Sequence, residues 1–343
     1  MTESNHHQGV SIRQVADAAG VSTASVSRAL SGRGAVSEAT RAKVEAAAAE
    51  LGYVVSSSAS SLASGRTRSI GVITPTMDRW YFATVAGTVA DQLARSGYDT
   101  TLYSVTDDPA EREALFGTVV RRRRVDALLV VALDLKAGEK EALAGSGLPV
   151  LGVGGPLPQL PAFTADETDM ARQATQHLLG LEHRRIAHLG GSAEFNVDFH
   201  VPARRREGWA AALREAGVEP EAAPVATADF TVAGGLDATL SLLGSGEAPT
   251  AVFAASDEMA IGAMLAAQRL GFRVPQDLSV VSIDGHPLGE AFGLTTVDQH
   301  VQDLGALAAD RIVAHLDRDV DLTSEHTAYD LVIRSSTARP RTD

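Results

Sequence analysis

Short hydroxyl side chains and an arginine follow one another closely in the segment Ser11–Leu30, "SIRQVADAAGVSTASVSRAL". Thr23, Ala24 and Ser27 are small enough for another molecule to approach closely, and Arg28 could reach a phosphate or the edge of a guanine. This chemistry needs the four side chains on the outward face of one helix. The alternative is an ordinary pair of helices with a solvated polar face, and spacing alone leaves that alternative open.

Three helices are predicted in this N-terminal region from their caps and stops. Apolar residues recur at i, i+3, i+4 and i+7 from Ile12, and Gln14 can complete a capping box with the serine three residues before it. The residues expected to start and stop the helices are Ser11, Gly20, Ser22, Ser37 and Gly52. The first two helices and their tight turn predict a helix-turn-helix motif.

The composition of the chain changes twice. Residues 55–69, "VSSSASSLASGRTRS", are rich in serine and indicate a linker. Beyond them, short apolar runs such as "SIGVIT", "DALLVVA" and "LSVVSID" alternate with helical patterns, which predicts two doubly wound parallel sheets with helices on both faces. The expected boundaries are a head at 1–54, a hinge at 55–68 and a core at 69–343, with lobes of about 69–162 plus 291–318 and 163–290 plus 319–343.

Charge is spread unevenly along the sequence. The chain carries −13 overall, whereas residues 1–68 hold seven Arg or Lys and five Asp or Glu, so this part carries +2 and the remainder −15. A mildly basic head on an acidic body confines attraction for DNA phosphates to one end. The sequence has no cysteine, no secretory signal and no run of eighteen apolar residues, which together predict a cytoplasmic protein that does not span a membrane.

Catalytic and metal-binding patterns are missing from the sequence. The ten histidines form no HExxH spacing, and no GxSxG, GxGxxG or Walker pattern occurs. The run "RRRR" at Arg121–Arg124 ends a predicted helix, where cations complement the helix dipole, so we do not interpret it as a nucleic-acid patch. We therefore expect no enzymatic activity, no metal and no cofactor.

Longer stretches carry a resemblance to a known family. The segment "IRQVADAAGVSTASVSRALSGRGAVSEATRAKVEAAAAELGY", followed by "SLASGRTRSIGVITP" and later by "RRREGWAAAL", "PTAVFAASDEMAIGAM" and "VPQDLSVVSIDG", resembles the lactose-repressor (LacI/GalR) family of regulators. The resemblance covers nearly the whole chain. It implies a helix-turn-helix head, a hinge helix and a two-lobed core like that of periplasmic sugar-binding proteins. It also implies homodimers on palindromic operator DNA, with a small effector in the cleft that changes operator affinity.

The resemblance further implies particular DNA contacts. Thr23 and Ala24 would read bases from the start of the recognition helix, and Leu62 on the hinge helix would enter the minor groove. Relatives commonly have Pro-Asn after "LGY", where this chain has Val55 and Ser56. The full set of expected DNA-binding residues is Thr23, Ala24, Ser25, Ser27, Arg28, Ser37, Ala59 and Leu62.

An effector site is implied in the same way. Arg205 in "RRREGW" would grip ligand hydroxyls or a carboxylate, and Asp284 in "VSIDG" would bind ligand at the carboxyl end of a strand. Such a pair suits a polyol, because the guanidinium donates, the carboxylate accepts and a hydroxyl does both. The alternatives are a surface charge for Arg205 and a loop cap for Asp284. Asp166, which follows another strand, is expected to line the same cleft.

Two stretches differ from the relatives. "TPTMDRWYFA" has Arg79 and Trp80 where relatives often have Asn-Pro, and Ser256 stands where many sugar-responsive relatives carry asparagine. The aromatic residues here could stack on a ligand ring or belong to the core. The full set of expected effector contacts is Arg205, Asp284, Asp166, Ser256, Tyr81, Phe82, Arg79, Trp80 and His286.

Together these features predict a DNA-binding repressor controlled by a sugar or sugar derivative. The alternatives are a nucleoside or other non-sugar effector, and a co-repressor-dependent or activating regulator. A transport-associated sugar-binding protein would need an export signal and no head, and an enzyme would need an acid/base or cofactor constellation. The tail after Arg334, "SSTARPRTD", has no leucine heptads, so we expect a homodimer.

Overall fold

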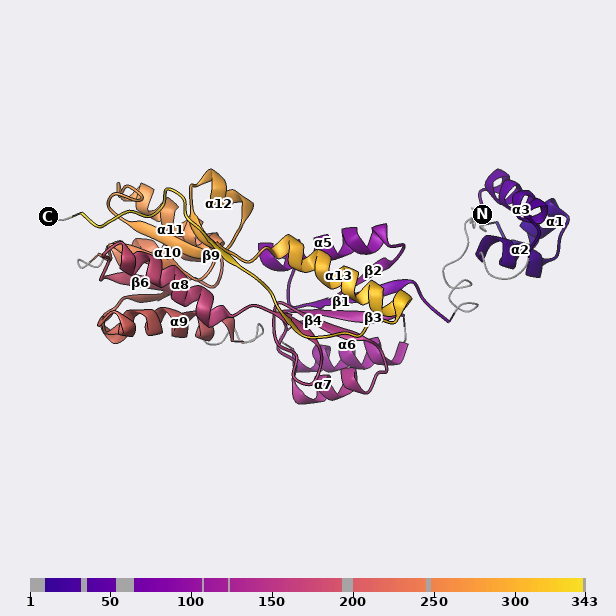
Figure 1. The fold of residues 1–343 in the computed structure, drawn as a ribbon, viewed down its shortest axis with the longest axis horizontal. Helices are drawn as coiled ribbons and strands as arrows, with labels where there is room; N and C mark the ends of the chain where they lie inside the picture. The colour runs from indigo at the N-terminus through magenta and orange to yellow at the C-terminus, as the bar shows by residue number, and fades with distance from the viewer. Residues whose placement is uncertain are drawn as a thin grey trace, which may run out of the picture. The chain divides into compact units, whose positions relative to one another are not determined.

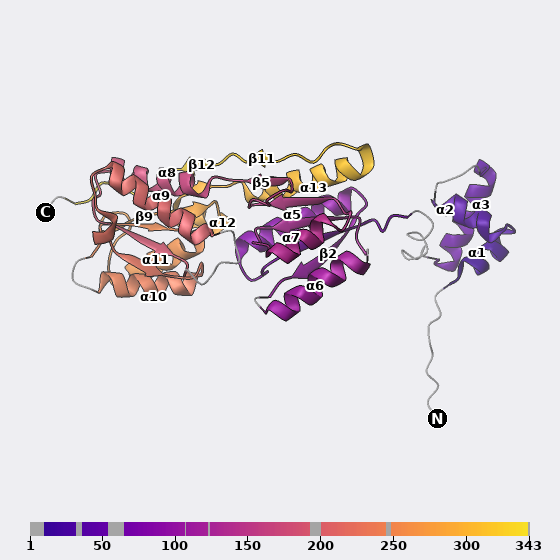
Figure 2. The ribbon, with the colours of Figure 1, turned by 90° about the horizontal axis from the view of Figure 1, so that it is seen from below.

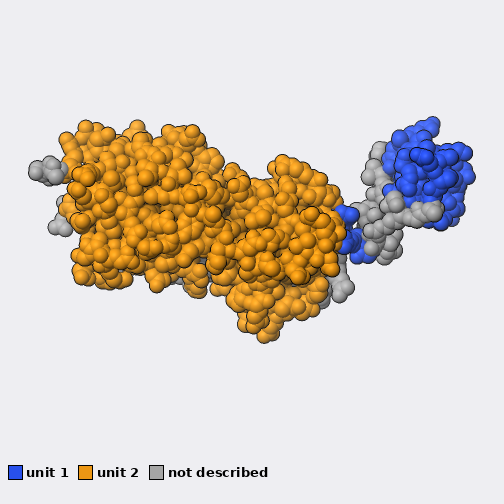
Figure 3. All heavy atoms as spheres, in the orientation of Figure 1, with its two compact units in different colours: residues 1–68 blue, residues 69–343 orange. Residues whose placement is uncertain are grey.

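The chain forms two compact units, residues 1–68 and 69–343, which Figure 3 shows in different colours. The computed structural model describes residues 10–31, 36–53, 65–106, 108–122, 124–192, 200–244 and 248–341. The expected hinge contacts Ala59 and Leu62 lie outside these residues. Among the described helices, none is long and apolar enough to cross a membrane.

The first unit contains three short helices around a small core. They are α1 (Ile12–Ala19), α2 (Thr23–Ser31) and α3 (Glu38–Leu51). Ser11 and Ser37 cap α1 and α3 as predicted, and Gly20 and Gly52 end them in the left-handed conformation that glycine adopts easily. The fully buried valines of this core are Val15, Val26 and Val44.

The first lobe of the second unit is built on a parallel sheet in the order β11-β5-β4-β3-β1-β2. Its elements are β1 (Ser69–Thr74), α5 (Trp80–Arg95), β2 (Asp99–Ser104), α6 (Pro109–Arg122), β3 (Ala127–Val131), α7 (Ala137–Ala144), β4 (Val150–Val153), β5 (Ala162–Thr164), α13 (Val301–Arg318) and β11 (Glu325–His326). Strand β1 is buried along its whole length, because helices cover both faces of the sheet.

The second lobe has a sheet in the order β12-β10-β9-β8-β6-β7, parallel except where β12 meets β10. Its elements are α8 (Glu167–Gly180), β6 (Ile186–Gly190), α9 (Val201–Glu215), the 3-10 helix η1 (Pro220–Ala222), β7 (Val225–Thr227), α10 (Val232–Leu243), β8 (Ala251–Ala254), α11 (Asp257–Arg269), β9 (Ser279–Asp284), α12 (Pro287–Ala291), β10 (Thr295–Asp298) and β12 (Asp330–Val332). The predicted fold class, a helix-turn-helix head and a two-lobed α/β core, is confirmed.

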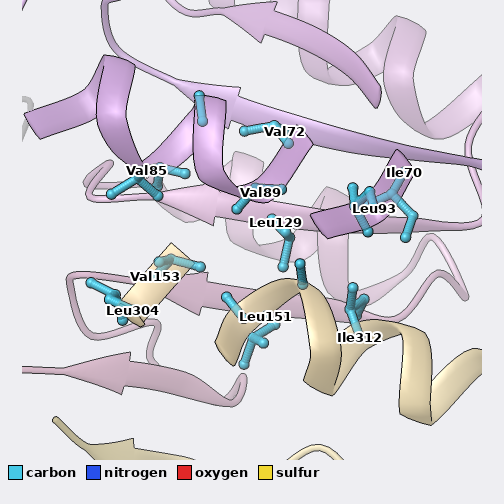
Figure 4. Packing of buried hydrophobic residues seen from close by; sticks show 14 of the residues in the cluster. Ile70, Val72, Val85, Val89, Leu93, Leu129, Leu151, Val153, Leu304 and Ile312 are labelled. Atoms are coloured by element: carbon cyan, nitrogen blue, oxygen red, sulfur yellow. The ribbon is translucent and has the colours of Figure 1, made fainter. Parts of the chain in front are cut away.

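Each sheet has a helix pair on each face. In the first lobe α5 and α13 cover one face and α6 and α7 the other. Figure 4 shows the first of these cores, in which Val85 and Leu93 of α5 and Ile312 of α13 meet Leu129 and Leu151 of the sheet. In the second lobe α10 and α11 cover one face and α8 and α9 the other.

The chain crosses between the lobes three times: from β5 to α8, from β10 to α13, and from β11 to β12 (Figure 2). The crossings follow the ends of β5 at Thr164, β10 at Asp298 and β11 at His326, whereas the expected boundaries were residues 163, 291 and 319. Strands β5 and β11 pair in the first sheet, and β10 pairs in the second. Short apolar strands look alike in either sheet, so composition does not show which partner each one takes.

Candidate functional site

The outward face of α2 presents the small side chains expected to contact DNA. Thr23 and Ala24 are exposed in the first turn, whereas Val26 and Ala29 are buried against the other two helices. Ser22 begins the helix, because its Oγ accepts a hydrogen bond from the backbone N–H of the residue three positions on, at 3.2 Å. This geometry leaves the start of α2 accessible to another molecule.

The other expected DNA contacts in the first unit have local roles as well. Arg28 is exposed, and its Nε donates to the backbone oxygen of Ala24 at 3.1 Å, so its side chain lies along α2. Ser25 and Ser27 are half-buried. The Ser37 hydroxyl accepts from the backbone N–H of Thr40 at 3.2 Å, so this oxygen already caps α3.

A cleft that is partly open to solvent lies between the two lobes of the second unit. Its lining comes from the carboxyl ends of β3, β4 and β9, from the starts of α5, α8, α9 and α11, and from the β7–α10 loop. Ligands of open α/β sheets bind at this edge of the strands. The lining residues are Arg79, Tyr81, Phe82, Ala132, Gly154, Glu167, Val201, Arg205, Phe230, Ser256, Glu258 and Asp284.

Arg205 lies at the centre of the polar side of this cleft and is only 4% exposed. Its Nε donates to Glu167 Oε2 at 2.7 Å, and its Nη1 donates to the backbone oxygen of Ala255. The same Nη1 lies 3.5 Å from Asp284 Oδ1. The buried guanidinium is held rigidly, because its hydrogen bonds to Glu167 and to the backbone oxygen of Ala255 fix its orientation.

Asp284 is fixed by its neighbours at the end of β9. Its Oδ1 accepts from Gln299 Nε2 at 3.0 Å and its Oδ2 from the backbone N–H of Asp257 at 3.3 Å. Burial raises the pKa of Asp284 well above its ordinary value, although Arg205 opposes this shift. Its φ of 144° is one that L residues rarely adopt, which is typical of residues constrained at a site.

Two aromatic residues expected from the sequence line the cleft from α5. Tyr81 and Phe82 meet edge to face, with ring centroids 5.5 Å apart. Gly154 permits this position of Tyr81, because a Cβ there would lie 2.0 Å from the phenol oxygen. Burial raises the pKa of Tyr81, so its hydroxyl stays protonated and can donate a hydrogen bond.

Asp166 is not among the residues that line the cleft, whereas its neighbour Glu167 is. Asp166 is exposed and its Oδ1 caps α8, accepting from the backbone N–H of Asp169 at 2.9 Å. Glu167 instead is buried, lines the cleft and meets Arg205. Glu167 was not among the expected contacts, although its place just inside a capped helix start can be seen in the sequence. Ser256 lines the cleft as expected, and its Oγ also caps α11 by accepting from the backbone N–H of Met259 at 3.3 Å.

Arg79, Trp80 and His286 were expected to touch the effector. Arg79 lines the cleft, but Trp80 and His286 are not among its lining residues. The rings of Trp80 and His286 are in tilted contact across the lobes, with centroids 4.7 Å apart. Effector contact by Trp80 and His286 therefore stays a prediction. Their contact with each other joins residues too distant in sequence for spacing to reveal it.

A helix-turn-helix head followed by a two-lobed core with a polar cleft defines a class of DNA-binding regulators. Residues 11–56 match the family model described as bacterial regulatory proteins, lacI family, and residues 175–337 match that of a periplasmic binding protein-like domain. The chain therefore belongs to the lacI family of bacterial regulatory proteins.

Individual relatives match over almost the whole chain. Catabolite control protein A of Priestia megaterium is 30% identical over 333 residues, covering 96% of this chain and 99% of that protein. The ribose operon repressor of Halalkalibacterium halodurans is 33% identical over 331 residues, covering 95% and 96%. The crystal structure of the lac repressor dimer bound to operator and the anti-inducer ONPF is 28% identical, with a TM-score of 0.84 and 96% and 100% coverage. These relatives are regulators by name, consistent with the prediction that the chain is not an enzyme.

Proposed function

We propose that this protein is a homodimeric transcriptional repressor whose affinity for a twofold-symmetric operator is set by a small, neutral, hydroxyl-bearing molecule in the cleft. The observation that carries the proposal is the buried Arg205 held between the carboxylates of Glu167 and Asp284. As a regulator of bacterial DNA it would act in the cytoplasm.

The charges of the cleft favour a neutral effector over an anionic one. The guanidinium of Arg205 is paired with the carboxylate of Glu167 and lies beside Asp284, and the charge of Arg79 acts on the carboxylate of Glu258. A phosphate or carboxylate ligand would add negative charge without an uncompensated cation to receive it. Hydroxyl groups can donate to the carboxylates and accept from Arg205, so a sugar fits this donor and acceptor set.

A nucleoside is the second candidate, and the aromatic lining favours it. Tyr81, Phe82 and Phe230 line the same cleft as Arg205 and Asp284. A base could lie against these rings while the ribose hydroxyls meet the polar side.

The effector would control DNA binding because it binds one arrangement of the two lobes more tightly than the other. Thr23 and Ala24 of each protomer would read one half-site, and the hinge around Leu62 would contact the operator centre only in one arrangement of the lobes. An effector that prefers another arrangement lowers operator affinity, in proportion to its preference between the two.

The site is tested by a thermal-shift screen of sugars, sugar phosphates and nucleosides. A neutral polyol or nucleoside should raise the melting temperature of the protein, and its phosphorylated counterpart should not. Arg205→Ala and Asp284→Ala should abolish the rise, because each removes one side of the hydrogen-bonding set.

The matched control is Arg204→Ala, which removes an exposed arginine of the same run and should leave the rise unchanged. A rise that persists in both cleft variants would refute the assignment of the site. A phosphorylated ligand that binds more tightly than its neutral counterpart would refute the proposed charge preference.

A further inference from the structure

Contacts between the lobes gather at the first turn of α5. The guanidinium carbon of Arg79 lies 5.5 Å from the ring centroid of Phe230, and the rings of Trp80 and His286 lie 4.7 Å apart with an angle of 39° between their planes. The backbone of Trp80 acts on the carboxylate of Glu258, where it lowers the pKa that burial raises. Figure 1 shows that this end of α5 is the one that faces the second lobe.

Two kinds of contact meet at this border of the cleft. Arg79, Phe230 and Glu258 line it, whereas Trp80 and His286, whose rings are in tilted contact, are not among its lining residues. His286 is fixed to the core of the second lobe. His286 donates its backbone N–H to Asp257 Oδ2 at 2.7 Å, and that carboxylate also accepts hydrogen bonds from Ser282 and Thr296.

We propose that Arg79, Trp80, Phe230, Glu258 and His286 form a cross-lobe wall that closes this side of the cleft and restricts it to molecules of about one sugar ring. A second ring attached to the ligand would collide with Arg79, which covers Phe230, and with the neighbouring Trp80–His286 pair. Arg79 and Trp80 are then residues that determine specificity by size. The chemical class of the ligand rests on the proposed function, whereas the closure does not.

The size limit can be tested without a known effector, because the chain contains no cysteine. Ser256→Cys introduces one thiol into the cleft with little change in side-chain volume. Its reaction rate is measured with small methyl methanethiosulfonate and with bulky fluorescein maleimide. In an Arg79→Ala/Trp80→Ala background the bulky reagent should react at least tenfold faster than with the wall intact, and the small reagent should change less than threefold.

Met77→Ala is the matched control, since Met77 is an exposed residue of the same loop and lies outside the cleft lining. It should leave both rates unchanged. Val201→Cys, at another lining position, repeats the measurement should the first variant fold poorly. Equal rates of the bulky reagent with and without the wall, including no reaction in either, would overturn the proposal.

Binding assays then separate this proposal from the proposed function. Ribose, glucose and galactose are compared with cellobiose, lactose and maltose by calorimetry on the unmodified protein and on the wall variant. Removing the wall should lower the ratio of disaccharide to monosaccharide Kd at least tenfold. A disaccharide that binds the unmodified protein as tightly as any monosaccharide would overturn the size limit. Failure of all six sugars would count against the sugar effector, and the labelling rates would still decide on the wall.

Discussion

At the scale of single residues, the burial of His188 outside the cleft makes the stability of the protein depend on pH. Its imidazole lies in the core of the second lobe between the rings of Trp209 and Phe253, with centroid distances of 5.4 and 5.3 Å. Burial lowers the pKa of His188 to about 3, because the charged form cannot be hydrated there. The folded chain therefore holds this side chain neutral, whereas the unfolded chain protonates it below about pH 6.5.

This difference predicts that His188 makes the core sensitive to acid. Between pH 6.5 and 3 the unfolded chain binds one more proton at this position than the folded chain, so the free energy of unfolding falls as the pH falls. His188→Phe keeps an aromatic ring in the stack and removes the titration. The loss of stability from pH 7 to pH 5 should then be smaller by about 2 kcal/mol, measured by urea unfolding.

The pH dependence, and not the absolute stability, is the readout, because Phe also alters packing. The buried Asp257 remains in both proteins; burial raises its pKa to about 6, which works in the opposite direction by favouring the folded state as the pH falls below 6. Replacing the exposed His326 by Gln is the control. An unchanged pH dependence in His188→Phe would contradict the prediction.

At the scale of elements, the close packing of α8 and α9 brings the cleft charges together. Gly208 faces α8, where a Cβ would lie 2.1 Å from the backbone oxygen of Thr168 and 2.9 Å from the Cβ of Ala171. Arg205 is one turn earlier on α9 and meets Glu167 at the start of α8. The glycine thus sets the helix separation at which the ion pair forms.

Gly208→Ala should therefore affect both stability and the site. The added methyl group must push the helices apart, at a cost of roughly 1–3 kcal/mol in the free energy of unfolding, and effector binding should weaken because Arg205 moves from Glu167. Urea unfolding and calorimetry measure the two effects. Gly180→Ala at the end of α8 meets nothing within 4 Å and should lower neither. If Gly208→Ala bound the effector as tightly as the unmodified protein, the packing of α8 on α9 would not determine the geometry of the site.

Much of the fold could be predicted from the sequence because its signals are local. Ser11 and Gly52 mark helix ends through bonds to neighbours within four residues, and the apolar runs identify the strands. Strand partners and the exact crossings between the lobes depend on distant residues, which local patterns do not reveal. In the cleft, Asp166 and Glu167 are both acidic, and only the phase of the capped helix decides which one turns inward. The Trp80–His286 pair joins the two lobes and left no pattern in the sequence.

At the scale of the whole molecule, the proposed function requires that DNA and effector affect each other equally. An effector that weakens operator binding by a given factor must itself bind the DNA complex more weakly by the same factor, with about 5- to 150-fold as the usual range. Anisotropy of a selected twofold-symmetric DNA and calorimetry of the effector on the complex provide the two factors. Unequal factors would mean that the two ligands do not share one equilibrium.

The salt dependence of operator affinity is a second test at this scale. Because the head is the basic part of an acidic chain, operator affinity should fall steeply as ionic strength rises, in proportion to the number of phosphates contacted. An affinity that is insensitive to salt would contradict DNA binding through the head.

The placement of α13 has a consequence for the order in which a nascent chain can fold. Val301, Leu304 and Ile312 complete a core whose other members, such as Ile70 and Val85, leave the ribosome more than two hundred residues earlier. The small N-terminal trihelical unit has its whole core within its first fifty-three residues and can fold during synthesis. The first lobe must wait, partly assembled and with apolar surface uncovered, until α13 has been synthesised.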